Sequence, residues 1–266
     1  IVATETSTVT FLSIPGFAFG RDLTWLQIAI GFAAGRCLVA LWMLPQYFHG
    51  SFLTSYEVLA QRFGGSTQQT ASLLFIVTRT LADGIRLFLT ALVLHEMTGL
   101  PIPWAVAGVG IVMIVYTYVG GVKAVIWTEF AQFGIYVGGA LLAFGLLIGR
   151  LPGGLSGALA DAGAAGKLRV FDLTLDPSEP YALSAGLLGG IFVTFGSHGV
   201  DQLMVQRYFC ARSLADARKA VVVGGLVVLV QFAFFLLLGT ALWAFYQAHP
   251  LAVAAGATGA VGTSAG

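Results

Sequence analysis

Long apolar runs recur along the whole chain, separated by short polar joints, and this pattern limits the possible fold more than any other feature. A helix that crosses the roughly 30 Å hydrocarbon core of a bilayer needs about 20 apolar residues. Charged residues make up 9% of the 266 residues and mean hydropathy is +0.89, whereas soluble domains carry about 25% charge. The pattern predicts an all-α, polytopic transmembrane helical bundle that forms one domain over residues 1–266.

Apolar runs of suitable length, bounded by charge, Pro or Gly, define six complete spans and one incomplete segment. The complete spans are Trp25 to Phe48, Ala71 to Met97, Pro103 to Val119, Ala124 to Gly149, Ala182 to Gly199 and Val221 to Ala248, and the incomplete segment is Ile1 to Phe19. We expect the chain to be a fragment, because it opens without Met and closes on the small-residue stretch Gly256 to Gly266.

Several function classes are disfavoured by composition. A net charge of +1 without a concentrated basic face argues against a nucleic-acid partner. Two cysteines give neither a disulfide framework nor a zinc site. We find no nucleophile, phosphate-loop or paired-carboxylate pattern, and therefore do not expect an enzyme.

Basic residues in the short joints predict the orientation, since cytoplasmic loops carry the excess of Lys and Arg. One side, which we expect to be cytoplasmic, holds Arg62, Lys123, Arg207, Arg212, Arg218 and Lys219. The long joint Leu151 to Pro180 is then an external loop, as a connector or as part of a substrate gate. On this assignment the chain of the first segment runs from the cytoplasmic side toward the outside. We expect the protein to be in the plasma membrane or the inner membrane of the cell.

Two segments favour interrupted helices. Seven hydroxyl or acidic residues crowd into Ile1 to Phe19 before Pro15, so this segment is either a broken helix that lines a cavity or an exposed loop before the first span. In the fifth complete span, Gly196 and Gly199 bracket Ser197 and His198. We expect His198 to be a hydrogen-bonded packing residue rather than a metal ligand, because no second His or Cys stands at ligand spacing.

Ionisable residues inside spans are functional candidates, because a charge in the hydrocarbon core is energetically unfavourable unless it is paired or in contact with water. Arg36 has no partner that the sequence identifies. Glu129 stands near the start of its span, either to hold or release a cation or to form a cap or salt bridge, for example to Lys123. Arg79, Asp83 and Arg86 share one helical face, and either all pair internally or one guanidinium stays free for an anionic substrate.

Four stretches resemble motifs of the sodium:solute symporter family. Tyr116 to Gln132 reads YTYVGGVKAVIWTEFAQ, which is similar to the family's Y-x-x-x-G-G-x-x-A-V-x-W-T-D-x-x-Q stretch. Gly199 to Tyr208 reads GVDQLMVQRY and resembles the G-x-[DN]-Q-x-x-[VI]-Q-R segment. Phe11 to Phe19 and the residues Thr54, Glu57 and Arg62 to Gly64 fit two further motifs. The resemblance covers essentially the entire chain and about half of a full-length member.

The resemblance implies a LeuT-type inverted-repeat fold, of which this chain supplies core helices one to seven, with the missing C-terminal helices as partners in the same protein. It implies Na⁺ as the coupling ion, held by main-chain carbonyls of the broken first helix, here at Ala3 and Thr6. The family acid that assists sodium passage is matched by Glu129, a Glu in place of Asp. No metal other than sodium is implied.

For the substrate, the resemblance points to the first, third and sixth core helices. The matching substrate-binding candidates are Thr10, Asp83, Arg86, Thr194 and Ser197. Sugar-carrying members have aromatic residues where this chain has Ser197 and His198, so a small organic anion is favoured over a simple sugar. The expected function is sodium-coupled symport by alternating access, and the alternative is a transporter-like sensor domain of a larger signalling protein.

Overall fold

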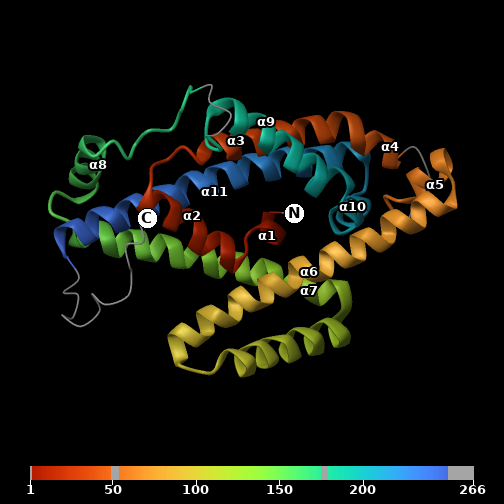
Figure 1. The fold of residues 1–266 in the computed structure, drawn as a ribbon, viewed down its shortest axis with the longest axis horizontal. Coiled ribbons are helices and arrows are strands. Elements are labelled where there is room, and N and C mark those ends of the chain that lie inside the picture. The colour runs from red at the N-terminus through yellow and green to blue at the C-terminus, as the bar shows by residue number, and fades with distance from the viewer. Residues whose placement is uncertain (1, 49–53, 175–178, 251–266) are drawn as a thin grey trace, which may run out of the picture.

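The computed structural model describes residues 2–48, 54–174 and 179–250, and these are helical with connecting loops. The elements are α1 (Val2–Glu5), α2 (Thr8–Gly20), α3 (Leu26–Leu38), η1 (Val39–Met43), α4 (Leu44–Phe48), α5 (Glu57–Phe63), α6 (Gly65–Thr98), α7 (Ile102–Arg150), α8 (Gly154–Ala164), α9 (Leu183–Thr194), η2 (Phe195–Val200), α10 (Gln202–Phe209) and α11 (Leu214–Ala248). The helices form an elongated bundle with α11 running along its length (Figure 1). The proposed all-α class is confirmed.

Five helical stretches in the described residues are long and apolar enough to cross a membrane. They are Leu26–Phe48, Ile102–Gly121, Ala124–Arg150, Leu183–Val200 and Leu214–Ala248, and each contains or closely matches one predicted span. The remaining predicted span, Ala71 to Met97, lies within the 34-residue helix α6, which is not among the five. Its middle carries three charged side chains, Arg79, Asp83 and Arg86, which are unfavourable in a helix that faces lipid.

The first segment is a broken helix, as one of the two interpretations of its hydroxyl-rich sequence proposed. Helix α1 ends at Glu5 and α2 begins at Thr8. Ser7 is the N-cap of α2, with extended backbone and a hydroxyl that accepts the Thr10 amide at 3.3 Å. A hydroxyl in this position replaces the intrahelical partner that the first amides of α2 lack.

The second predicted interruption also forms, but it extends past the glycines. A π-helical turn, η2, covers Phe195–Val200, and the chain then becomes extended at Asp201. The Asp201 carboxylate accepts the amides of Leu203 and Met204 and so begins α10 as an N-cap. The acid, rather than the glycines, therefore ends the interruption.

Helix α7 contains two spans joined by a kink. Its 49 residues comprise two helices that meet at Gly121, where the backbone is not helical, with φ 56° and ψ −158°. Only glycine adopts this conformation without a steric penalty. The chain direction changes there, which explains why the sequence predicts separate spans on either side of Gly121.

Glycines allow the closest helix contacts in the bundle. At Gly31 of α3, a Cβ atom would lie 2.6 Å from the Leu187 carbonyl oxygen, and at Gly190 of α9 it would lie 2.6 Å from that of Ile28. Likewise, a Cβ at Gly239 of α11 would overlap the Pro15 carbonyl of α2. Small residues thus bring α3 onto α9 and α2 onto α11, as is usual between helices in membranes.

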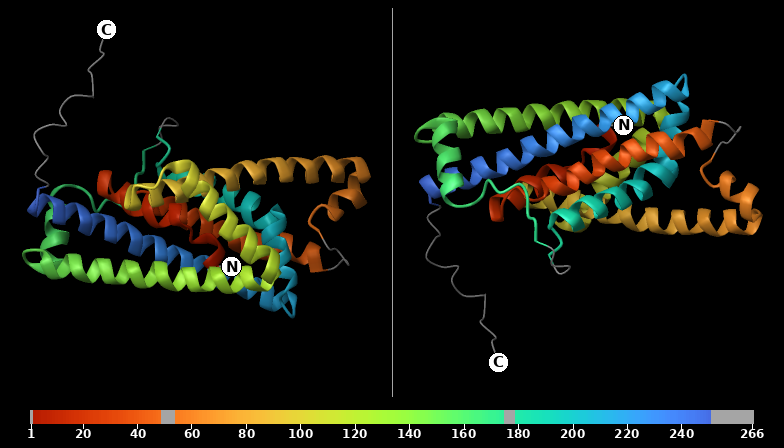
Figure 2. Two further views of the ribbon diagram at one scale, coloured as in Figure 1. Left: turned by 90° about the horizontal axis from the view of Figure 1, so that it is seen from below. Right: turned by 90° about the horizontal axis from the view of Figure 1, so that it is seen from above.

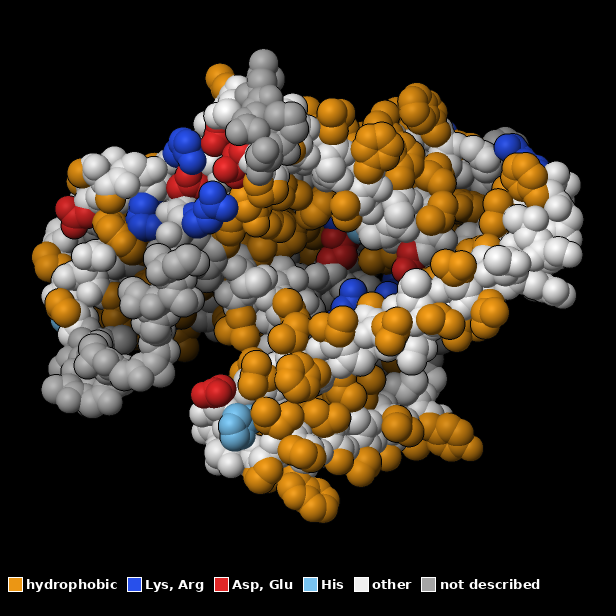
Figure 3. Space-filling model, in the orientation of Figure 1, with side chains coloured by type: hydrophobic (Ala, Val, Ile, Leu, Met, Phe, Trp, Pro, Cys, Tyr) orange, Lys and Arg blue, Asp and Glu red, His pale blue; other side chains and the backbone are white. Residues whose placement is uncertain are grey.

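Helix α6 and the first half of α7 form an arm beside this bundle, visible from two directions (Figures 1 and 2). The arm carries large exposed apolar side chains, including Trp104, Ile114 and Tyr118, which is 90% exposed (Figure 3). Soluble proteins rarely expose such a continuous apolar surface. The surface is suited to contact with lipid or with other transmembrane helices.

Candidate functional site

The polar side chains of the bundle interior gather at the break between α1 and α2. Three consecutive residues at this break bond to three different helices: Thr4 to α7, Glu5 to α3 and Thr6 to α11. Consecutive side chains can point to three neighbours because the helix ends here. The break is therefore the point at which the helices of the bundle are joined by polar contacts.

Glu5 forms a buried ion pair with Arg36, which comes from α3 and is 1% exposed. The second oxygen of the Glu5 carboxylate lies 3.1 Å from Nε2 of His198 in η2. The other ring nitrogen of His198 lies 2.9 Å from the Ser197 hydroxyl. The expectation that His198 is a hydrogen-bonded packing residue agrees with these contacts, and Arg36 obtains the partner that the sequence did not identify.

Thr6 is held on the opposite side of the break by Gln231 of α11. The Thr6 hydroxyl and the Gln231 amide exchange hydrogen bonds at 3.0 and 2.9 Å, and both residues are buried. Helix α1 is four residues long, so its carbonyl groups do not continue into a further helical turn. Those of Val2 and Glu5 instead accept hydrogen bonds from the hydroxyls of Thr6 and Thr10, at 3.4 and 3.5 Å. Oxygens of this kind, at the negative end of a helix, suit a cation such as Na⁺. The predicted sodium-site residues Ala3 and Thr6 both lie at this position.

Glu129 of α7 joins α1 to α10. Its carboxylate accepts a hydrogen bond from the Thr4 hydroxyl at 2.8 Å and one from the Arg207 guanidinium at 2.7 Å. About two turns further along α7, the Tyr136 hydroxyl lies 2.8 Å from the Thr8 hydroxyl. The ion pair of Glu129 is thus made with Arg207 of α10, while the side chain of Lys123, the partner considered from sequence, lies outside the described residues.

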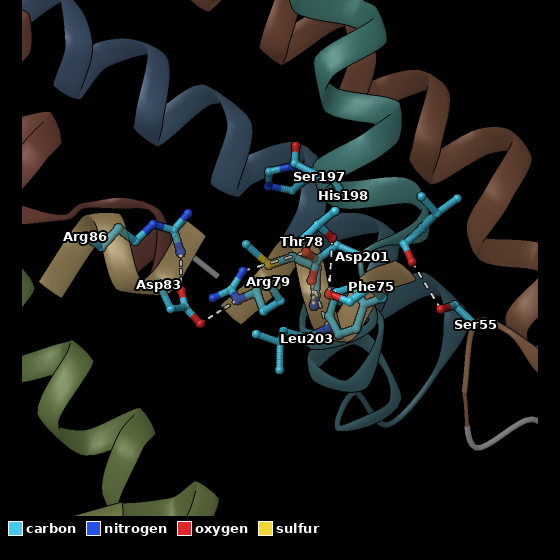
Figure 4. Close-up of polar contacts among 12 residues, drawn as sticks. Ser55, Phe75, Thr78, Arg79, Asp83, Arg86, Ser197, His198, Asp201 and Leu203 are labelled. Atoms are coloured by element: carbon cyan, nitrogen blue, oxygen red, sulfur yellow. Dashed lines mark hydrogen bonds and ion pairs between the residues drawn. The ribbon is translucent and has the colours of Figure 1, made fainter. Parts of the chain in front are cut away.

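The charged face of α6 is shown in Figure 4. Asp83 accepts hydrogen bonds from Arg79 at 2.9 Å and from Arg86 at 3.0 Å. Arg79 also reaches toward Asp201, with 3.7 Å between the charged atoms. This is the internal pairing that the sequence offered as one interpretation. The Arg86 side chain is nevertheless about half exposed, and among the described residues its guanidinium pairs with Asp83 alone. Part of the guanidinium is therefore accessible at the protein surface.

The remaining predicted substrate residues are not all oriented toward one space. The Thr10 hydroxyl lies 3.2 Å from that of Ser7, beside the break. Ser197 is exposed and donates to the Val193 carbonyl or contacts His198. Thr194, by contrast, is 1% exposed and packs between α9 and α3, where its hydroxyl donates to the Phe32 carbonyl. Its position is that of a helix-packing residue.

A cavity of about 180 Å³ opens beside the second helix break. Its lining comes from the end of η1, from α4, from the residues just before α5 and from α5 itself, with Val200 from η2. It includes Met43, Tyr47, Ser55 and Tyr56. The lining includes none of the predicted substrate residues. Sequence reasoning also missed Glu5 and Gln231; the unpaired Arg36 in an apolar span was the one signal that a buried acid had to lie nearby.

The loop after α8 fastens the far end of α2. The ammonium group of Lys167 is largely buried and donates to the carbonyls of Ala18, Phe19 and Arg21. Burial lowers the pKa of Lys167, and the nearby Asp22 carboxylate opposes this effect. Burial by itself raises the pKa of Asp22, but hydrogen bonds from Thr24 and the charge of Arg169 outweigh it and lower the pKa of that carboxyl.

Five membrane-length helices, together with a short helix pair that is broken where polar side chains meet, define an α-helical membrane protein with broken helices. The model of the sodium:solute symporter family matches residues 1–266, and the chain belongs to this family. The motif resemblance seen in the sequence is thereby confirmed.

Curated relatives include the human sodium/iodide cotransporter, which is 31% identical over 231 residues, 85% of this chain and 36% of that protein. The sodium/sialic acid symporter SiaT of Proteus mirabilis (strain HI4320) is 28% identical over 262 residues, 96% of this chain and 52% of that protein. The human sodium-coupled monocarboxylate transporter 1 is 34% identical over 158 residues, 59% of this chain and 26% of that protein.

A solved structure of a Na⁺-coupled sialic acid symporter, in a substrate-bound outward-open state, superposes with a TM-score of 0.87 at 27% identity. The superposition covers 96% of this chain and 54% of that one. The likeness confirms the LeuT-type symporter fold. This chain spans about half the length of that symporter, and 36%, 52% and 26% of the three curated relatives described above.

Proposed function

We propose that the protein containing this chain is a sodium-coupled symporter that imports a small organic solute by alternating access. The observation that carries the proposal is the break between α1 and α2, where main-chain carbonyl groups at a helix end and the bonded side chains of Thr4, Glu5 and Thr6 lie inside a membrane bundle. Family membership and relatives named for sodium coupling support the same activity. The alternative, a membrane sensor, has no support among these relatives.

In this proposal Na⁺ binds at the end of α1, at the level of Ala3 and Thr6. The ion would supply positive charge that organises the break, and its inward movement gains about 2.3 kcal/mol per 100 mV of membrane potential. Glu129 would assist the passage of the ion toward the cytoplasm. For this to happen, the carboxylate must exchange its present contacts with Thr4 and Arg207 for the cation.

The substrate class that we propose is a small organic anion, for example a carboxylate. The outward-facing part of Arg86 can donate two parallel hydrogen bonds to such a group. The three relatives described above are named for iodide, a monocarboxylate and sialic acid, all of which are anions. Thr10 and Ser197 offer hydroxyls near the two breaks for the rest of the solute, whereas Asp83 positions Arg86.

The test is uptake of labelled organic acids, amino acids and sugars into proteoliposomes that contain the full-length protein, with and without an inward sodium gradient. We expect sodium-dependent accumulation of at least one organic acid. Accumulation of an uncharged sugar alone would overturn the anion proposal. Absence of sodium-dependent accumulation of every compound by folded protein would favour the sensor over the symporter.

A further inference from the structure

The ion pair between Glu5 and Arg36 is set within the break where the proposed sodium site lies. Both oxygens of the Glu5 carboxylate have partners, Arg36 on one and His198 on the other. The side chains of Glu5 and Arg36 are 13% and 2% exposed. A carboxylate engaged in this way is already paired with the positive charge of Arg36, so it does not present an unpaired negative charge to the break.

Arg36 reaches Glu5 through space that a glycine leaves open. A Cβ atom at Gly225 of α11 would lie 2.8 Å from Cδ of Arg36, too close for an unshifted side chain. The guanidinium keeps Nε and Nη1 without a partner among the described residues. Such a buried cation is tolerated only beside an opposite charge. The arrangement of α3, α11 and α1 is therefore built to bring one positive charge to Glu5.

We propose that Arg36 is a positioning residue that sets the sodium affinity of the α1–α2 break by neutralising Glu5. This inference rests on the proposed sodium symport. With both residues present, the added charge at the break is close to zero, and the carbonyl groups of α1 alone attract the ion. Without Arg36, the Glu5 carboxylate would add an uncompensated negative charge beside the site.

The proposal predicts opposite effects for the two single variants. In Arg36→Gln the unbalanced carboxylate should tighten sodium binding, and in Glu5→Gln the unbalanced guanidinium should weaken it. Each shift should be about tenfold or more, the effect of a unit charge about 12 Å away or nearer at an effective dielectric constant of about 20. The double variant Glu5→Gln/Arg36→Gln restores neutrality. Its sodium affinity should return to within about twofold of the wild-type value.

Binding of radioactive sodium to the purified full-length protein measures these affinities without requiring transport. Arg36→Lys keeps the charge and should lie closer to wild type than Arg36→Gln. Arg62→Gln removes the same charge from an exposed position on α5 and is the matched control, with unchanged affinity. Shifts of both single variants in the same direction, shifts of less than twofold, or a double variant that does not recover would overturn the proposal.

Thermal stability separates this inference from the proposed function. Each single variant leaves one buried charge unpaired and should lower Tm, whereas the double variant should recover most of the loss. If the wild-type protein binds no sodium, the symport proposal fails, while the Tm cycle still tests the ion pair. If a single variant does not fold, recovery of folding in the double variant supports the pair, and failure of the double variant to fold contradicts it.

Discussion

Replacement of Gly190 by Ala tests whether the close contact between α3 and α9 requires a residue without a side chain at this position. The new Cβ would lie 2.6 Å from the Ile28 carbonyl oxygen and 2.9 Å from Cα of Gly31. These neighbours are backbone atoms of α3, so they cannot rotate away as a flexible side chain could. The two helices would have to separate, and overpacking of this kind costs about 1–3 kcal/mol.

Gly189, the preceding residue, is a matched control, because a Cβ there would have no atom within 4 Å. Ala is favoured over Gly in a helix by up to about 1 kcal/mol, so Gly189→Ala should be neutral or stabilising. Gly190→Ala should be less stable than Gly189→Ala by about 1–3 kcal/mol in thermal or denaturant unfolding of the full-length protein in detergent. Equal stability of the two variants would refute the close backbone contact.

Three further predictions concern the side chains of the site and its outer loop. Glu129→Ala should slow sodium-driven uptake, because Thr4 and Arg207 lose their shared acceptor; normal kinetics would remove Glu129 from the mechanism. Lys167→Met should lower Tm, because three carbonyls at the end of α2 lose their donor; an unchanged Tm would show that this cap is dispensable. The lowered pKa of Asp22 stabilises the fold above the unfolded-state value near 3.8, and this contribution is lost as pH falls through the lower folded-state value. In Asp22→Asn the free energy of unfolding should therefore depend less on pH below about pH 4 than in the wild type. An unchanged pH dependence would contradict the lowered pKa of Asp22.

The spans and their interruptions could be predicted from the sequence because both are encoded locally. The length of an apolar run predicts a membrane helix. Groups of hydroxyl residues around Ser7, and the glycines that include Gly196, mark the places where regular helical hydrogen bonding is interrupted. The cap that begins α11 is local in the same sense, because Ser213 accepts the Asp216 amide at 3.1 Å. These features depend on residues within one or two helical turns.

The partners across helices could not be predicted, because they depend on how distant segments pack. Glu5 and Arg36 are 31 positions apart, and Thr6 and Gln231 are 225 apart. Thr194 is a second example of a side chain whose surroundings depend on how distant helices pack. Its position near the second break favours a substrate contact by resemblance, yet the rotation of α9 against α3 turns its hydroxyl into the helix interface.

The three contacts at the first break explain how an ion bound there could influence the whole bundle. Thr4, Glu5 and Thr6 are consecutive, and each is fixed to a different helix. A cation that draws the carbonyl groups of α1 together must shift at least one of these side chains, and the shift is passed to its partner helix. The partners are Glu129 on α7, a buried Arg on α3 and Gln231 on α11. The Glu129 side chain is 22% exposed, whereas Arg36 and Gln231 are buried. Water can therefore replace the contact with α7 most easily, and α7 is the helix whose link to α1 should be lost first when this region rearranges.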